Sequence, residues 1–235
     1  MIMTTIASNL QAVRTAIEEA AMGCGRRAED VCLLAVSKTF TQDAVRAAYL
    51  AGQTRFAESY VQEALDKIAA LHDLPIEWHY IGPIQSNKTR AIAEHFAWVH
   101  SVDRLKIAER LSEQRPANLP PLQVCLQVNI SGEDSKNGVH PDQVCALAHA
   151  AAKLPRLKLR GLMAIPAPGD DVAAQRLPFG QLRNLLSQLN RQNLNLDTLS
   201  MGMTNDFAAA IAEGATMVRI GSAIFGNRIY VKESL

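Results

Sequence analysis

The feature that most constrains the fold of this sequence is a regular alternation of short apolar runs with longer segments of helical spacing. Eight runs rich in Val, Ile and Leu have the length of strands, and amphipathic stretches separate them. This alternation predicts an α/β protein with parallel strands joined by right-handed helical crossovers. The predicted strands are residues 31–37, 55–58, 77–82, 97–101, 122–129, 157–165, 196–200 and 216–220.

The number of predicted strands favours a closed (β/α)8 TIM barrel over an open, doubly wound sheet. The chain has 235 residues, close to the roughly 250 typical of such a barrel. Residues 1–21 form an amphipathic pattern that predicts a helix before the first strand. No Ser/Gly-rich linker or low-complexity block interrupts the pattern, so we expect residues 1–235 to form a single domain.

Charge and cysteine usage exclude several classes of protein. The chain has 24 basic and 23 acidic residues, so it lacks the charge excess expected of a nucleic-acid binder. Its cysteines form no C-x-x-C pair, and Cys32 and Cys125 lie in apolar runs, which indicates free buried thiols. The N-terminus lacks the basic start of a signal peptide, and no apolar run is long enough for a membrane span. We therefore expect a cytoplasmic protein that does not bind membranes. The histidines show no metal-binding spacing, so no metal site is expected.

Lys38 is the strongest candidate for covalent chemistry. It directly follows the first predicted strand, and residues at the carboxyl ends of barrel strands face the active site. Partial desolvation at the mouth of an apolar cavity frees a lysine amine for Schiff-base formation. A solvated lysine at a strand end is the alternative that this position alone leaves open.

The loops after the last two predicted strands have the features of a phosphate site. One continues as Ser200-Met201-Gly202-Met203-Thr204, and the other begins with Gly221 and Ser222 before a short helical stretch. Glycines let backbone amides approach a ligand, and helix N-termini bind anions. Barrels commonly bind phosphate at these two loops. Gly221 and Ser222 are therefore predicted to hold a phosphate, with two ordinary glycine turns as the alternative.

Arg219 is a charged residue inside the last apolar run. A buried guanidinium needs a partner, and strand alternation places Arg219 on the same side as Gly221. Barrel closure would bring the first strand, with Lys38, beside the eighth. Lys38 would then offer an amine to an aldehyde, Arg219 a guanidinium to a ring nitrogen, and Gly221 with Ser222 a site for a phosphate. A ligand with these three groups is pyridoxal 5′-phosphate (PLP), which the sequence therefore predicts as cofactor. The alternatives for Arg219 are an internal salt bridge and a charge that lies on this strand face without a function.

Three further residues are weaker pocket candidates. His79 lies in the third predicted strand and could be catalytic, but a hydrogen-bonded histidine in the barrel core is the stronger interpretation. Asn129 ends the fifth strand and could line the pocket. Met163, near the end of the sixth, could pack on the cofactor ring or in the core.

Long stretches of the chain resemble the pyridoxal phosphate homeostasis proteins, short relatives of the alanine racemase barrel that have the PLP-binding fold type III. The resemblance covers nearly the whole chain, and its motifs are LLAVSKTF, RFAESYVQEALDK, EWHYIGPIQSNK, VHSVDRLKIAERL, LQVNISGEDSKNGV, LRGLMAIPAP and LSMGMTNDFAAAIAEGATMVRIGSAIFG. It implies a Schiff base on Lys38, the ring nitrogen at Arg219, and the phosphate near Ser200, Gly221 and Ser222. The family usually has Gly-Glu-Asn where this chain has Ala57-Glu58-Ser59, so a cofactor contact from that Asn would be shortened or lost here.

The resemblance also implies a role in buffering PLP and delivering it to apo-enzymes, without substantial catalytic turnover, in a monomer or weak dimer. The sequence agrees, because full-length racemases carry a further domain with a second acid/base group, and this chain ends at Leu235. A small PLP-dependent enzyme, such as a weak amino-acid racemase, is the alternative. A barrel that binds another phosphate ligand is a third interpretation.

Overall fold

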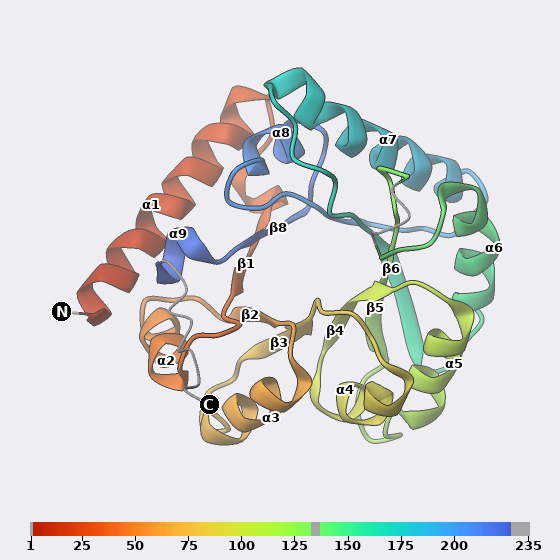
Figure 1. The fold of residues 1–235 in the computed structure, drawn as a ribbon, viewed down its shortest axis with the longest axis horizontal. Helices are drawn as coiled ribbons and strands as arrows, with labels where there is room; N and C mark the ends of the chain where they lie inside the picture. Colours follow the sequence, from red (N-terminus) through yellow and green to blue (C-terminus); the bar gives the residue numbers. More distant parts are fainter. Residues whose placement is uncertain (1, 133–136, 227–235) are drawn as a thin grey trace, which may run out of the picture.

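The computed structural model of the protein describes residues 2–132 and 137–226, which form a barrel of parallel strands surrounded by helices (Figure 1). Neighbouring strands pair in chain order, and β8 pairs with β1 to close the barrel. This confirms the predicted fold class. The strands are β1 (Cys32–Val36), β2 (Arg55–Glu58), β3 (Glu77–Tyr80), β4 (Trp98–Val102), β5 (Leu122–Gln127), β6 (Leu157–Met163), β7 (Thr198–Ser200) and β8 (Met217–Ile220).

Helices follow the strands and cover the outside of the barrel. They are α1 (Ile2–Gly23), α2 (Gln42–Leu50), α3 (Val61–Ala70), α4 (Thr89–His95), α5 (Leu105–Gln114), α6 (Pro141–Ala151), α7 (Val172–Asn190), α8 (Phe207–Ala212) and α9 (Ser222–Phe225), with the short 3₁₀ turns η1 (Ala28–Asp30) and η2 (Ser86–Lys88). Helix α1 precedes β1, as predicted, and packs against α2, α8 and α9. Its buried face includes Leu10 and Ile17.

The register of β1 against β8 places the segment that contains Lys38 beside the segment that contains Gly221. Cys32 pairs with Met217 and Ala35 pairs with Ile220. Lys38 follows β1 and Gly221 follows β8, so both lie at the carboxyl end of the barrel. The predicted adjacency of these segments is confirmed.

The strands bury side chains on both of their faces. The larger apolar core lies between the sheet and the helices, while a smaller cluster of Trp98, Cys125, Met163 and Met217 packs by itself. Polar residues are also fully buried, among them His79, His100 and Ser200. Within the described residues no helix is long and apolar enough to cross a membrane.

Candidate functional site

A cavity of about 470 Å³ opens where the strands end. Its walls come from the ends of β1 and β8 and from the segments that follow β1, β2, β3, β6, β7 and β8. Ligand sites of (β/α)8 barrels lie at this face, because the loops after the strands converge there. The volume is in the range of small-molecule sites.

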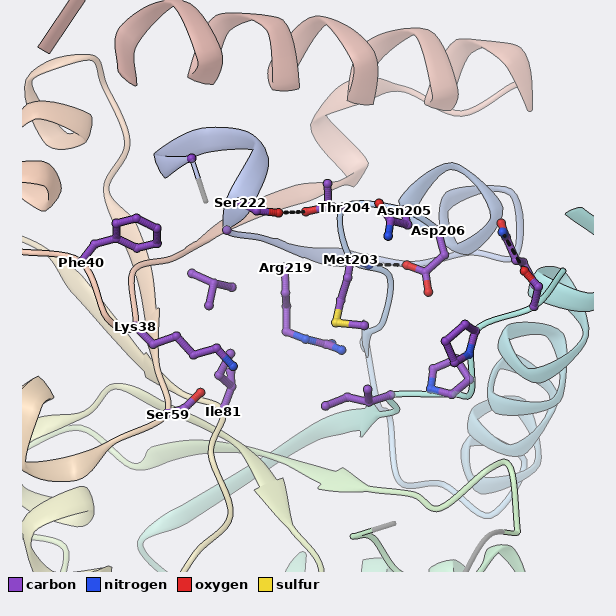
Figure 2. A pocket seen from close by; sticks show the side chains of 18 residues that line it. Lys38, Phe40, Ser59, Ile81, Met203, Thr204, Asn205, Asp206, Arg219 and Ser222 are labelled. Atoms are coloured by element: carbon purple, nitrogen blue, oxygen red, sulfur yellow. Dashed lines mark hydrogen bonds between the residues drawn. The ribbon is translucent and has the colours of Figure 1, made fainter. Parts of the chain in front are cut away.

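Lys38 extends its side chain into this cavity from the segment after β1 (Figure 2). The next residue, Thr39, has φ of +69°, a conformation that is costly for a β-branched residue. Its backbone N–H donates to Oε1 of Glu63 at 2.6 Å. This bond holds the chain in the strained turn that directs Lys38 inward.

A buried ionic cluster supports the other side of the Lys38 backbone. The Lys67 side chain is 6% exposed, and its Nζ donates to the Ser37 carbonyl at 2.7 Å and to Glu58 and Glu63 at 2.8 and 2.6 Å. The Ser37 hydroxyl also donates to Glu58 Oε1 at 2.7 Å. Burial raises the pKa of the Glu58 carboxyl, and the Lys67 ammonium opposes that rise. Residues 37 and 39 are therefore both anchored, which fixes the origin of the Lys38 side chain.

Arg219 reaches the cavity from the inner face of β8, and its guanidinium is held by two acceptors. Nη1 donates to Ser200 Oγ at 2.9 Å, and Nη2 donates to the Ala164 carbonyl at 3.0 Å. Burial lowers the pKa of Arg219 to about 10, which leaves the group protonated at neutral pH. The guanidinium thus presents a fixed positive charge to the cavity.

Hydroxyl groups form another wall of the cavity. Thr204 Oγ1 and Ser222 Oγ lie 3.4 Å apart and face each other across the loops that follow β7 and β8 (Figure 2). Asp206 lies in the same loop, where Oδ1 accepts from the backbone N–H of Met203 at 2.6 Å. Gly221 permits a close approach of β8 to β1, because a Cβ atom there would lie 3.0 Å from the Val36 carbonyl oxygen.

The structure brings together five of the residues predicted from the sequence. The cavity is lined by Lys38, Ser59, Arg219, Gly221 and Ser222. Ser59 stands beside Lys38 at the end of β2 (Figure 2). The convergence follows from barrel closure, since these residues are far apart in the chain.

Other predicted residues lie elsewhere. Ser200 was expected at the phosphate, but its hydroxyl is buried beneath Arg219 and accepts from it. Met163 packs in the core cluster with Trp98 and Cys125, and His79 is fully buried in the barrel. Asn129 lines a separate groove, together with His140 and Arg191. Ser200, His79 and Met163 point into the barrel interior but do not line the cavity, whereas Asn129 follows the end of β5 and lies at the separate groove.

Sequence reasoning missed Thr204 and His100. Thr204 is separated from β7 by Gly202, whose φ of +93° turns the chain back toward β8. The glycine and the following Thr were visible in the sequence, but the resemblance to the family implied a phosphate contact near Ser200 and gave Thr204 no role. No local pattern marked His100, which contacts Ser200 across the barrel.

Comparison with known proteins agrees with this architecture. The family model of the alanine racemase N-terminal domain matches residues 5–228. A pyridoxal phosphate homeostasis protein of Pseudomonas aeruginosa is 63% identical over 228 residues, which cover 97% of this chain and 98% of that protein. The protein of the same name from Escherichia coli K12 is 53% identical over 234 residues, covering 98% of this chain and 100% of its own length.

Solved structures extend the comparison to three dimensions. PipY of Synechococcus elongatus with PLP bound is 38% identical, has a TM-score of 0.83, and is matched over 94% of this chain and 100% of its own. An alanine racemase from Corynebacterium glutamicum shares the fold, with a TM-score of 0.67 at 17% identity over 96% of this chain and 63% of its own. The chain therefore belongs to the pyridoxal phosphate homeostasis proteins, a family built on the alanine racemase N-terminal barrel.

Proposed function

We propose that this protein binds PLP covalently through Lys38 and serves in PLP homeostasis by holding the cofactor and delivering it to apo-enzymes. The observation that carries the proposal is the convergence of an amine, a guanidinium and a pair of hydroxyls on one cavity. These groups come from Lys38, Arg219, and Thr204 with Ser222. The PLP-bound structure of PipY and the names of the relatives support it.

The residues fit the chemistry of PLP group by group. The aldehyde requires a lysine amine, which Lys38 would supply. The pyridine nitrogen requires a hydrogen-bond partner, which would be Arg219. The phosphate requires several donors, among which would be the hydroxyls of Thr204 and Ser222. When bound, the cofactor supplies an electrophilic aldehyde and an electron-withdrawing ring.

Arg219 determines the state of the ring nitrogen that this site favours. A guanidinium only donates hydrogen bonds, so a nitrogen facing it must offer a lone pair. Ser200 and Ala164 hold the guanidinium in place. The site therefore favours an unprotonated ring, which withdraws electrons less strongly than a pyridinium.

The lining of the cavity favours a carrier over an enzyme. Among the described residues that line it, the ionisable side chains are Lys38, Asp206 and Arg219. Asp206 is engaged by the Met203 amide, and Arg219 stays protonated. Racemisation, the alternative function, needs a second acid or base opposite the lysine. The site thus suits retention of PLP without turnover, in agreement with relatives named for homeostasis.

Transfer of cofactor tests the proposal. The PLP-loaded protein is mixed with the apo-form of a PLP-dependent enzyme, and recovery of that enzyme's activity is followed. We expect the loaded protein to restore activity at a rate that exceeds simple release of PLP into a trap for the free cofactor. Recovery no faster than trapping would argue against delivery while leaving PLP binding itself standing.

We further propose that residues 1–235 form one cofactor-binding domain that acts as a monomer or weak dimer in the cytoplasm, without nucleic-acid or membrane partners. The closed barrel and the packing of α1 on its helices support the single domain. The nearly balanced charge supports the absence of a nucleic-acid partner. Size-exclusion chromatography with light scattering tests the oligomeric state.

A further inference from the structure

A chain of hydrogen bonds runs from Arg219 through the inside of the barrel to Glu77 on β3. Arg219 Nη1 lies 2.9 Å from Ser200 Oγ, which lies 2.8 Å from His100 Nδ1. His100 Nε2 lies 2.9 Å from His79 Nδ1. His79 Nε2 lies 3.0 Å from Glu77 Oε1, which also accepts from Arg55 Nε at 3.0 Å. The chain thus links the cavity to half-exposed residues at the start of β3 and β2.

The two ends of this chain fix the position of every proton between them when each imidazole is neutral. Arg219 can only donate and the Glu77 carboxylate can only accept, so with one proton on each imidazole Ser200 Oγ accepts from Arg219 and gives its own proton to His100 Nδ1. His100 then carries its proton on Nε2 and donates to His79 Nδ1. His79 in turn donates from Nε2 to Glu77, whose carboxylate only accepts. All four bonds point from Arg219 to Glu77, and each imidazole holds one proton.

Burial and neighbouring charge agree with neutral imidazoles. His79 and His100 are fully buried, and burial lowers the pKa of both. Arg219 adds to the lowering at His100, whereas Glu77 opposes it at His79. Trp98 stacks on His79 at an interplanar angle of 11° and a centroid separation of 5.5 Å, which fixes the plane of that ring.

We propose that His79 and His100 are positioning residues for Arg219, locked as neutral Nε2–H tautomers so that Ser200 always turns a lone pair toward the guanidinium. A Ser200 hydroxyl without this acceptor could rotate its proton toward Arg219 and release it. The interior chain therefore fixes the guanidinium that faces the cofactor ring nitrogen. This role rests on the proposed function, whereas the tautomers themselves do not.

Histidine NMR on the ¹⁵N-labelled protein without cofactor tests the tautomers directly. We expect His79 and His100 to show protonated Nε2 and unprotonated Nδ1 at neutral pH, and to gain a second proton only below the ordinary histidine pKa of about 6.5. The exposed His72 and His95 lie outside the chain of hydrogen bonds and serve as internal references in the same spectra. An Nδ1–H tautomer at either buried histidine, or ordinary titration of either one, would overturn the proposal.

Two probes of the cavity then test the action on Arg219. The first probe is PLP, and the second is 1-deazapyridoxal 5′-phosphate, which has carbon in place of the ring nitrogen. We expect His100→Phe and Ser200→Ala each to raise the dissociation constant of PLP about tenfold. The dissociation constant of the deaza analogue should change less than about twofold. The double variant should bind PLP no more weakly than either single variant, because His100 acts through Ser200.

Met163→Leu provides the matched control, because Met163 is fully buried in the same barrel interior and lies outside the chain of hydrogen bonds. It should affect the two probes equally. Equal weakening of both probes by His100→Phe and Ser200→Ala would mean a merely structural role and would contradict the proposal. If the unsubstituted protein bound neither probe, the proposed function would fail, and the NMR result would still decide the tautomers.

Discussion

The Nζ atom of Lys67 lies 2.7 Å from the carbonyl oxygen of Ser37, the residue directly before Lys38. The same Nζ contacts Glu63, whose Oε1 also accepts from the Thr39 amide. One buried lysine thus organises the backbone on both sides of another. The backbone from which the Lys38 side chain extends is therefore held in place. Lys67 itself is bound by the carboxylates of Glu58 and Glu63 and does not line the cavity.

Lys67→Met should destabilise the protein strongly. The substitution removes the cation from Glu58 and leaves a buried carboxylate without compensation. Breaking one side of a buried ion pair costs about 3 to 5 kcal/mol. Urea unfolding at neutral pH measures this loss. As a matched control, Arg46→Met removes an exposed pair with Asp73 and should cost much less, because solvent screens exposed ion pairs. Similar losses in both variants would contradict the role of the cluster.

Thr204→Val should weaken binding of PLP much more than binding of pyridoxal, which lacks the phosphate. The two side chains have nearly the same shape, but valine removes the hydroxyl that faces Ser222. Loss of a hydrogen bond to a charged group costs about 1.5 to 3 kcal/mol. Equilibrium titration of both ligands gives the two dissociation constants. Equal effects on them would place the phosphate elsewhere.

The free energy of unfolding should fall as the pH drops below about 6.5. Burial lowers the pKa values of His79 and His100 in the folded state, so below the ordinary histidine pKa the unfolded state binds more protons. Each such group contributes a slope of up to about 1.4 kcal/mol per pH unit between pH 6.5 and the folded pKa. Denaturant unfolding from pH 7 to pH 5 measures the slope, and His100→Phe should reduce it. An unchanged slope in His100→Phe would show that His100 does not contribute.

The PLP-loaded protein should not turn over common L- or D-amino acids at a typical enzyme rate. The cavity offers no well-placed second acid or base among its described lining residues, and a missing group of this kind typically forfeits about 10²- to 10⁴-fold in rate. Chiral chromatography of the products after long incubation checks this. Steady product formation at about 1 per second or more, lost in Lys38→Ala, would favour the small-enzyme alternative.

The barrel could be predicted from sequence because its strands are continuous apolar runs. The apolar run before Lys38 marked the end of β1. The apolar run that contains Arg219 marked the end of β8 and made the charge within that strand visible. Barrel closure then predicted that these residues meet, and the pairing of Ala35 with Ile220 confirms the adjacency of their strands. This inference required only strand order and the position of each residue within its strand.

The supporting contacts could not be predicted in the same way. His100 and Ser200 meet across the barrel, 100 residues apart, and their contact depends on which side chains fill the interior. Ser200 and Thr204 are both hydroxyl residues near the end of β7, and only the turn at Gly202 distinguishes the one under Arg219 from the one facing Ser222. The Lys67 cluster joins β1, β2 and α3 through side-chain reach, which local sequence patterns do not encode.

The most direct test of the central claim is to locate the cofactor on the chain. The protein is loaded with PLP, reduced with borohydride and digested, and the peptides are analysed by mass spectrometry. The site described above predicts one stoichiometric pyridoxyl group on the peptide that contains Lys38, and none at that position in Lys38→Ala. A stoichiometric label on Lys67, Lys88 or another lysine, with Lys38 unmodified, would contradict the assignment of this cavity as the PLP site.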